Sequence, residues 1–324
     1  MKAVVCKEFG PPEKLSVEEM PDPEAGPGQV VIEVKASAVT FPDTLMIEDK
    51  YQFKAAPPFV PGGEVAGIIS TVGEGVEDFT EGDRVVGSAG IVGGFAEKAA
   101  VPAVSTRKIP DGADFAEATG LLYAYGTGYY GLHHRGQLQP GETLLVLGAG
   151  GNVGLAAVEL GKMMGARVIA AASSDEKLEL CRERGADASI NYSTENLKER
   201  AKALTDGHGC DVVYDAVGGD YAEAAIRATA WGGRFLVIGF TAGIPRIPLN
   251  LTLLKSCQIV GVFYGAMVAR EPETRDAIAR DLLQWTADGQ LSPHVSRRYS
   301  LSEGPQALRD MIDRKAVGRI VVEP

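Results

Sequence analysis

The sequence predicts an α/β protein built on a doubly wound parallel sheet, with a second domain of twisted β structure. In the centre of the chain, segments typical of buried strands alternate with segments typical of helices, which is the pattern of a doubly wound sheet. The first 120 or so residues instead hold short alternating strands between turns rich in proline and glycine. That pattern favours a largely antiparallel β domain or partial barrel.

The clearest motif is a glycine-rich turn that follows the continuous apolar run of residues 144–147. The first glycine turns the chain, the second lets backbone N–H groups approach a pyrophosphate, and the third allows close packing of helix on sheet. The helix that follows presents its N-terminus to the anion. The predicted dinucleotide contacts are Gly148, Gly151, Asn152, Val153 and Gly154. The alternative is a glycine turn in an α/β domain that binds no ligand.

The segments around this turn supply the context that a glycine motif needs. Strands are predicted over residues 167–172, 188–190, 211–217, 234–240 and 258–263. Helices are predicted over residues 176–184, 195–204 and 221–230. A strand before the turn, a helix after it and βαβ units downstream together predict a dinucleotide site.

Composition narrows the class of protein. A length of 324 residues suits two domains, and 45% apolar with 23% charged residues is typical of a globular protein. No apolar run approaches the roughly 20 residues that cross a bilayer, and the N-terminus lacks a signal-peptide core, so we expect a cytoplasmic protein. The net charge of −11 argues against nucleic acid or an anionic membrane as a partner. The four cysteines form no Cys-x-x-Cys pair, and His133 and His134 are adjacent, so neither set predicts a metal site.

Several strings resemble one known superfamily. They are Gly-Gly-Glu-Val-Ala-Gly at residues 62–67, Val-Gly at 72–73, Gly-Val at 75–76, Gly-Asp-Arg-Val at 82–85 and the glycine-rich turn. Together they resemble the medium-chain dehydrogenase/reductase superfamily over essentially the whole chain. The resemblance implies a Rossmann domain over residues 122–264 and a discontinuous GroES-like catalytic domain over residues 1–121 and 265–324.

The resemblance also bears on metal binding. In the zinc alcohol dehydrogenases of this superfamily a Gly-His-Glu loop supplies a zinc-binding histidine, and Gly63 stands at that place here. No cysteine occurs near residues 40–43, where a further ligand is expected. The segment of residues 87–95 is short and lacks the cysteines that hold structural zinc in those enzymes. We therefore expect no metal.

Within the superfamily the chain resembles the zinc-independent NADPH:quinone oxidoreductases, the zeta-crystallin-like branch. Similar strings in that branch match residues 41–44, 148–154, 190–192, 215–218 and 237–240. The branch usually carries Asn where this chain has Thr40, which keeps a hydrogen-bonding side chain there. The resemblance implies catalytic-site positions at Thr40 and Asp43. It also places Thr127 beside the nicotinamide, and a nicotinamide and acceptor cleft lined by Val217, Gly239, Phe240, Phe263 and Tyr264. Helix packing is the alternative for Thr127, and core or interface packing for the aromatic residues.

The residues that follow the predicted strand 167–172 indicate which cofactor binds. An NAD-preferring site carries an acid there for the ribose 2′-OH, whereas this chain has small residues that include Ser173 and Ser174, followed by Lys177. Hydroxyl groups and a cation suit a 2′-phosphate, and the resemblance adds Tyr192 and Arg314. The sequence thus favours NADPH, although Asp175 lies close by and is the candidate for a ribose acid.

The chemistry leaves alternatives open. The leading hypothesis is an NADPH-dependent quinone reductase that also accepts electron-poor enones. An enoyl thioester reductase is the alternative enzyme, and Tyr51 matches the tyrosine assigned as proton donor in those relatives, although it is also explained as a loop residue closing the cleft. A non-catalytic NADPH-binding structural protein is the alternative of another class. The predicted edge strand at residues 258–263 favours a homodimer.

Overall fold

The chain folds into two compact units, which are described one at a time. The computed structural model describes residues 1–324. The mixed-sheet unit comprises Met1–Tyr123 and Leu282–Pro324, and the parallel-sheet unit comprises Ala124–Asp281. The chain thus changes units at 123/124 and 281/282, whereas the boundaries expected from the sequence lie at 121/122 and 264/265. None of the helices combines the length and the apolar character needed to cross a lipid bilayer.

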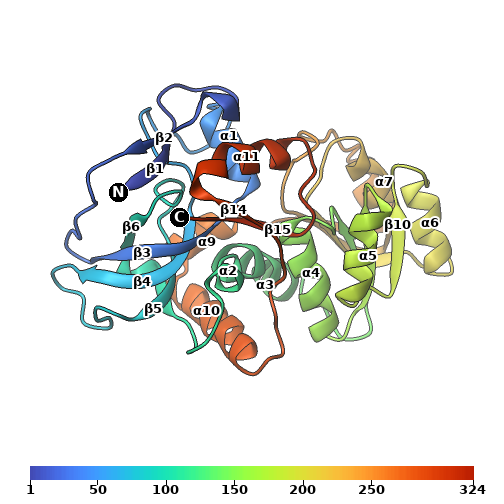
Figure 1. The fold of residues 1–324 in the computed structure, drawn as a ribbon. Helices are drawn as coiled ribbons and strands as arrows, with labels where there is room; N and C mark the ends of the chain where they lie inside the picture. Colours follow the sequence, from blue (N-terminus) through green and yellow to red (C-terminus); the bar gives the residue numbers. More distant parts are fainter. The chain divides into compact units, whose positions relative to one another are not determined.

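The parallel-sheet unit is the predicted doubly wound sheet, drawn from green to light orange in Figure 1. Its six strands are all parallel and lie in the order β10-β9-β8-β11-β12-β13. They are β8 (Thr143–Leu147), β9 (Arg167–Ala172), β10 (Ala188–Asn191), β11 (Cys210–Asp215), β12 (Thr229–Val237) and β13 (Gln258–Gly261). The helices between and after them are α4 (Asn152–Met163), α5 (Asp175–Glu183), α6 (Leu197–Leu204), α7 (Tyr221–Ala228), α8 (Asn250–Lys255) and α9 (Tyr264–Arg270). The chain order reverses between β8 and β11, which is where such sheets bind ligands.

Both faces of this sheet are covered. Every residue of β8 is buried, as expected of a strand between two helical layers. Leu145 and Leu147 belong to a core cluster with residues of α6, α7 and α8. Side chains alternate along a strand, so Leu144 points to the other face, where a side chain at Gly161 of α4 would lie only 2.6 Å from it. Helix α4 can therefore lie directly on the sheet.

A continuous helical stretch precedes β8. It consists of the π-helical turn η3 (Leu121–Tyr125), the short helix α3 (Gly126–Tyr129) and the π-helical turn η4 (Tyr130–Arg135). The stretch runs from residue 121 to residue 135, with wide π-helical turns before and after α3. A Cβ atom at Gly128 would lie 2.9 Å from Leu160 Cδ1, so the absence of a side chain lets α3 approach α4 closely.

The mixed-sheet unit contains the expected twisted β structure. Its main sheet has the order β14-β15-β3-β4-β5-β7, with β6 paired to β3, and a separate sheet joins β1 to β2. The strands are β1 (Lys2–Val5), β2 (Ser16–Glu19), β3 (Gln29–Ala38), β4 (Glu64–Val72), β5 (Arg84–Ser88), β6 (Lys98–Pro102), β7 (Thr106–Lys108), β14 (Val295–Ser300) and β15 (Arg319–Glu323). The helices are α1 (Phe41–Ile47), α2 (Phe115–Ala118), α11 (Gly304–Ile312) and the 3-10 turns η1 (Pro12–Lys14), η2 (Ala103–Ser105) and η5 (Leu301–Glu303). Helix α10 (Pro272–Ala287) contains the change of unit at 281/282.

The strand predicted over residues 234–240 is displaced. It runs over Thr229–Val237, and α7 before it stops at Ala228 rather than at residue 230. At its start the pairing with β11 shifts register between Cys210 and Val212, and Gly232 has a φ of +74° that glycine adopts without strain. At its end the N–H groups of Ile238 and Gly239 both donate to the Asp215 carbonyl, so these residues leave the ladder.

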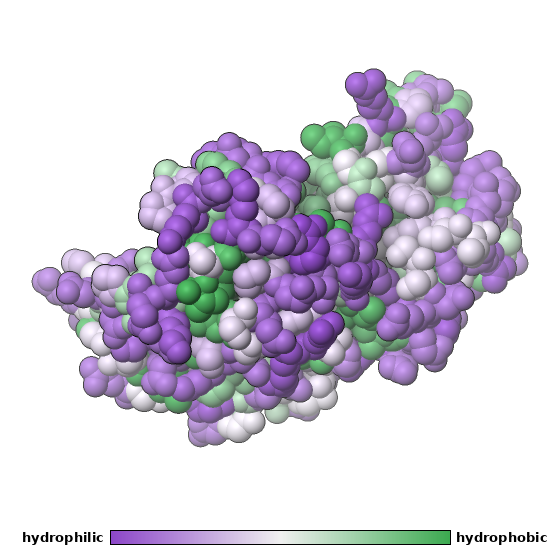
Figure 2. Space-filling model, turned by 45° about the horizontal axis from the view of Figure 1, so that its top comes forward, coloured by the Kyte–Doolittle hydropathy of each residue, from purple (hydrophilic) through white to green (hydrophobic).

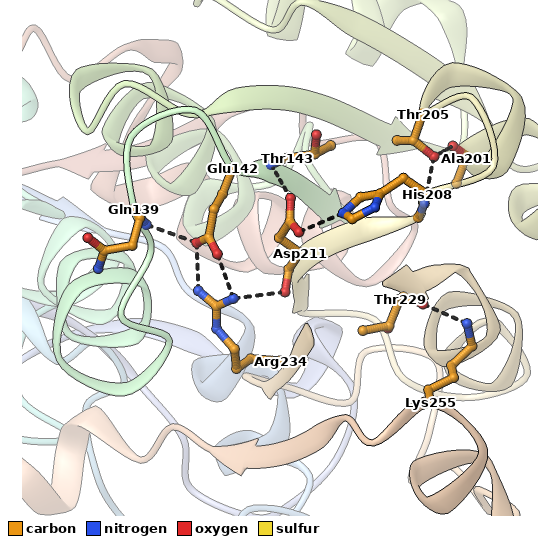
Figure 3. Close-up of polar contacts among 11 residues, drawn as sticks. Gln139, Glu142, Thr143, Ala201, Thr205, His208, Asp211, Thr229, Arg234 and Lys255 are labelled. Carbon is orange, nitrogen blue, oxygen red and sulfur yellow. Dashed lines mark hydrogen bonds and ion pairs between the residues drawn. The ribbon is translucent and has the colours of Figure 1, made fainter. Parts of the chain in front are cut away.

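A polar network fastens the amino-terminal edge of the parallel sheet (Figure 3). Arg234 Nη2 lies 2.6 Å from Glu142 Oε2, and Nη1 lies 2.8 Å from Oε1, so the pair is bidentate. Arg234 Nε also donates to the Gly136 carbonyl. Beside this pair, Asp211 Oδ2 accepts the Thr143 N–H and Oδ1 lies 3.0 Å from His208 Nε2. The network joins the amino-terminal ends of β8, β11 and β12.

We expect Arg234→Met to destabilise the protein by about 2 kcal/mol, because it removes the guanidinium donors from the Gly136 carbonyl and from the Glu142 carboxylate, which then keeps the Gln139 N–H, while the methionine keeps the apolar stem. The matched control is Arg227→Met, which breaks an i,i+4 pair with Glu223 whose side chains are 42% and 43% exposed. That change should cost about 0.5 kcal/mol or less. Urea denaturation followed by circular dichroism measures both, and equal losses would contradict the assignment.

Candidate active site

Two of the glycines in the turn after β8 are required by the protein's own geometry. Gly148 has a φ of +70°, and a Cβ atom there would lie 2.9 Å from Val217 Cγ2. A Cβ atom at Gly154 would lie 2.1 Å from the Gly148 carbonyl oxygen, a distance that real atoms do not show. The first turn of α4 can therefore pack against the Gly148 carbonyl only because Gly154 has no side chain.

Gly151 is different, because nothing inside the protein demands a glycine there. Its φ is −95°, and an added Cβ would meet only the Gly148 carbonyl oxygen, at 3.4 Å, which is ordinary contact. Gly151 is the N-cap of α4 and has no side chain to accept the N–H groups of the first turn, which Asn152 and Val153 begin. An open cradle of N–H groups at the positive end of a helix fits a diphosphate.

The structure brings the predicted 2′-phosphate residues to this turn. Ser173 and Ser174 follow β9 directly, and Ser174 caps α5 by accepting the Lys177 N–H at 3.4 Å. The stem of Lys177 lies against Gly150, where an added Cβ would be 2.5 Å from Lys177 Cβ. The sequence analysis missed this role of Gly150, which allows the lysine stem to lie on the turn.

Tyr192 lies at the same edge. It follows β10, and its N–H donates to the carbonyl of Ala172, the last residue of β9 (3.1 Å). Its ring centroid is 4.5 Å from that of Tyr221, the first residue of α7. Sequence reasoning missed Tyr221, because it belongs to a helix distant in the chain and carries no motif. Arg314, also predicted here, belongs to the mixed-sheet unit, where it follows α11 with a φ of +60°.

The loops after β11 and β12 are tied to each other. Asp215 ends β11, and its Oδ1 accepts the N–H groups of Val217 at 2.8 Å and Gly218 at 2.9 Å. Burial raises the pKa of this carboxyl, and the two N–H bonds oppose that shift. The Val217 carbonyl accepts the Ala242 N–H at 2.8 Å. Val217 and Gly239 therefore stand in fixed loops at the carboxyl edge of the sheet, where ligands bind.

The predicted aromatic residues divide into two kinds. Phe240 and Phe263 follow β12 and β13 and are 43% and 49% exposed. Tyr264 is only 6% exposed, and an added Cβ at Gly126 would lie 2.4 Å from its hydroxyl oxygen, so its ring packs on α3. Thr127, also in α3, is half-buried, while its neighbours from residue 124 to residue 132 are buried. Phe240, Phe263 and Thr127 thus remain accessible, and Tyr264 belongs to the interior.

In the mixed-sheet unit, the predicted residues Thr40 and Asp43 form one hydrogen-bonded pair. Thr40 is the N-cap of α1, and both its N–H and its hydroxyl donate to Asp43 Oδ2 at 2.7 Å. Burial raises the pKa of Asp43 to about 6, against the hydrogen bonds that it accepts from Thr40 and from the Gly62 N–H. Asp43 is 3% exposed, and its carboxylate holds Thr40 at the start of α1.

Tyr51 lies near this pair. Burial raises the pKa of its hydroxyl, and the charge of Asp43 raises it further, whereas a hydrogen bond with Tyr123 lowers it. Its ring also makes an edge contact with Phe53, at 5.9 Å between centroids. Both upward shifts keep the proton on Tyr51 and make its hydroxyl a weaker acid, and the Tyr123 hydrogen bond opposes them. The sequence analysis missed Tyr123, which sits in an apolar helix without any catalytic pattern.

Gly63 has no room for a side chain. A Cβ atom there would lie 2.4 Å from the Gly90 carbonyl oxygen, and Ile91 Cα would also be close. The backbone of residues 90–91 thus occupies the space into which the histidine of the zinc alcohol dehydrogenases would project. No group of three or more His, Cys, Asp or Glu side chains is arranged to hold a metal ion.

Glu64 is a buried structural acceptor. It is 1% exposed, and its Oε1 accepts the Leu122 N–H at 3.0 Å. Burial raises its pKa to about 7, while the Arg319 guanidinium and backbone N–H groups act in the opposite direction. Arg319 in turn donates to the carbonyls of Thr119 and Glu117. Glu64 and Arg319 together hold the chain where η3 begins.

Comparisons with known proteins agree with this architecture. Residues 26–111 match the alcohol dehydrogenase GroES-like domain, and residues 152–281 match the zinc-binding dehydrogenase family. The quinone oxidoreductase-like protein 2 homolog of Nematostella vectensis is 39% identical over 99% of this chain and 88% of that protein. A mycobacterial protein solved in complex with NADPH superposes with a TM-score of 0.92 at 30% identity, covering 100% of both chains. The quinone oxidoreductase of Escherichia coli, also complexed with NADPH, gives 0.91 at 26% identity, again over 100% of both chains.

A parallel sheet with a glycine cradle and a GroES-like unit define a nucleotide-dependent dehydrogenase or reductase. The chain belongs to the medium-chain dehydrogenase/reductase superfamily, on its quinone oxidoreductase branch.

The raised pKa of Glu64 predicts a pH-dependent stability. The folded protein keeps this proton up to about pH 7, whereas the unfolded chain releases it near the ordinary value of 4.5. The native state therefore loses stability as pH rises through this window, by up to about 3 kcal/mol. We expect Glu64→Gln to flatten the plot of unfolding free energy against pH between these limits. The exposed Glu77→Gln is the control, and parallel plots for wild type and Glu64→Gln would refute the assignment.

Proposed function

We propose that the protein is an NADPH-dependent reductase that transfers hydride to quinones and related electron-poor enones without zinc. The observation that carries the proposal is the pair of exposed rings, Phe240 and Phe263, at the carboxyl ends of the adjacent parallel strands β12 and β13. Large apolar side chains exposed at the ligand-binding edge of a sheet favour a flat, apolar acceptor. The similarity to proteins named quinone oxidoreductase supports the same class of substrate.

NADPH is the cofactor that the parallel-sheet unit supports, and when bound it supplies the hydride. The first turn of α4 presents backbone N–H groups to the diphosphate. Ser173, Ser174 and Lys177 provide hydroxyl groups and a cation for a 2′-phosphate. The half-buried Thr127 and the fixed loops at Val217 and Gly239 orient the nicotinamide in this proposal.

The acceptor chemistry demands little of the mixed-sheet unit. Reduction of a quinone gives a delocalised phenolate, which water can protonate, so no dedicated acid is required. The blocked position at Gly63 is compatible with this, because the histidine that binds zinc in the zinc alcohol dehydrogenases has no counterpart here. The protein then has to hold the acceptor against the nicotinamide and exclude water.

An enoyl thioester reductase is the second candidate, and Tyr51 is the observation that favours it. Reduction of such a substrate leaves a carbanion that needs a proton. The Tyr51 hydroxyl keeps its proton at neutral pH, and its hydrogen bond with Tyr123 beside the buried Asp43 fixes its position, so it has a proton to give to a bound substrate.

An acceptor panel decides between these functions. With NADPH as donor, we expect kcat/KM for naphthoquinone or phenanthrenequinone to exceed that for crotonyl-CoA at least ~10-fold, as measured by the loss of reduced-nicotinamide absorbance. If crotonyl-CoA is instead the better substrate, Tyr51→Phe should lower its turnover by about 10²- to 10⁴-fold, the contribution of a general acid. Rapid binding of NADPH without oxidation by any acceptor would favour the non-catalytic alternative.

We also propose that the protein is a homodimer joined at β13. This strand is the last in the order of the parallel sheet and pairs only with β12, so its outer edge is unpaired. Figure 2 shows a face that is mostly hydrophilic, with hydrophobic residues in a few separate patches. Several large apolar side chains of the parallel-sheet unit are exposed just before or within β13, namely Ile244, Leu249, Leu253, Leu254 and Ile259. An edge strand with apolar neighbours suits antiparallel pairing with its own copy across a two-fold axis.

Light scattering tests this dimer. We expect a mass of twice the 34.2 kDa of the chain. The double change Leu253→Glu and Leu254→Glu should give a monomer, because it places two carboxylates opposite their symmetry copies. Val104, which is 63% exposed in the mixed-sheet unit, supplies the control Val104→Glu. A monomeric wild type would refute the proposal.

A further inference from the structure

The carboxyl end of β9 carries an acid that conflicts with a 2′-phosphate. In dinucleotide-binding sheets an acidic residue near this point accepts hydrogen bonds from the ribose 2′-OH and so selects NADH. Here Asp175 follows Ser174 directly and is exposed. A carboxylate free to turn toward the ribose would repel the phosphate of NADPH.

The structure shows where this carboxylate is held. Asp175 Oδ1 accepts a hydrogen bond from Asn191 Nδ2 at 2.8 Å. Asn191 is the last residue of β10 and pairs in register with Ala172, the last residue of β9. The bond therefore spans the carboxyl ends of two adjacent strands and holds Asp175 toward β10.

The orientation of the Asn191 amide is fixed. Its Oδ1 accepts the Ser193 N–H at 3.1 Å, and an N–H can bond only to the oxygen end of the amide. The Nδ2 end must then face Asp175. The Asn191 backbone N–H also donates to Glu195 Oε2 at 2.8 Å, and the residue is 9% exposed, so it has little freedom to turn away.

Neighbouring residues of Asp175 have the chemistry that suits a phosphate. Lys177 lies along Gly150 on the glycine-rich turn, and Ser174 caps α5 through its hydroxyl. Asp175 is the first residue of α5, where the helix dipole stabilises its charge in place. The acid is thus stabilised without needing a cofactor hydroxyl.

We propose that Asn191 is a specificity-determining positioning residue that excludes Asp175 from the ribose and so favours NADPH over NADH. The inference rests on the proposed use of NADPH. Asn191 itself does not touch the cofactor. It acts by holding Asp175, so that a 2′-phosphate meets Ser173, Ser174 and Lys177 instead of a carboxylate.

Binding of two nucleotides that differ only in the 2′-phosphate tests the proposal without catalysis. The probes are adenosine 2′,5′-bisphosphate and adenosine 5′-monophosphate, with dissociation constants measured by titration calorimetry. Wild-type protein should bind the bisphosphate more tightly. In Asn191→Ala the ratio of the two constants should fall ~10-fold, mainly through weaker binding of the bisphosphate. The control Asn196→Ala removes the N-cap of α6, which accepts the Glu199 N–H, and should leave the ratio within about twofold.

A second variant shows whether Asn191 acts through Asp175. In Asp175→Ala the ratio should change less than about twofold, and adding Asn191→Ala to it should have no further effect on the ratio. An unchanged ratio in Asn191→Ala, or the same fall in the Asp175→Ala background, would overturn the inference.

The Asp175→Ala variant also decides the matter if Asn191→Ala does not fold, because Asp175 is exposed. A ~10-fold loss of monophosphate binding in it would show that Asp175 itself binds the ribose and would overturn the inference. Wild-type protein that binds NADPH no better than NADH would instead contradict the proposed cofactor, and the inference with it.

Discussion

The parallel-sheet unit depends on one close approach, that of α4 to the turn after β8. A Cβ atom at Gly154 would lie 2.1 Å from the Gly148 carbonyl oxygen, so any side chain there would push the helix from the sheet. Gly128 and Gly161 continue the same constraint along α4, against Leu160 and Leu144. The absence of side chains thus fixes the axis of α4, and the axis fixes where its first N–H groups point.

Much of this fold could be predicted because β strands buried on both faces leave continuous apolar runs. The strand at residues 167–172 was expected with its observed bounds. The bounds of β12 could not be predicted. Its start depends on a register shift against β11, and its end depends on two N–H groups that donate to the Asp215 carbonyl. The wide turns of η3 and η4 also depend on packing, and no local sequence pattern predicts them.

The candidate site was predicted where its residues lie close in sequence. Ser173, Ser174 and Lys177 follow one strand, so their meeting at the turn follows from the position of that strand. Asn191 and Tyr221 were missed because they come from later elements, and only the parallel register of β9 with β10 brings Asn191 to Asp175. Tyr123 was missed for a similar reason, since its bond to Tyr51 joins separate parts of the mixed-sheet unit. These positions stay predictions as functional residues.

A protein with 43 acidic and 32 basic residues must bind an anionic cofactor against its own charge. Near the expected site, two acids have partners within the protein. Asp215 is held by two backbone N–H groups, and Asp175 by the Asn191 amide. In the proposed site, backbone N–H groups, hydroxyls and the Lys177 ammonium would face the cofactor, and such groups attract phosphate over short distances whatever the net charge. On this proposal, selectivity for the cofactor depends on how the acids are restrained as much as on the cations present.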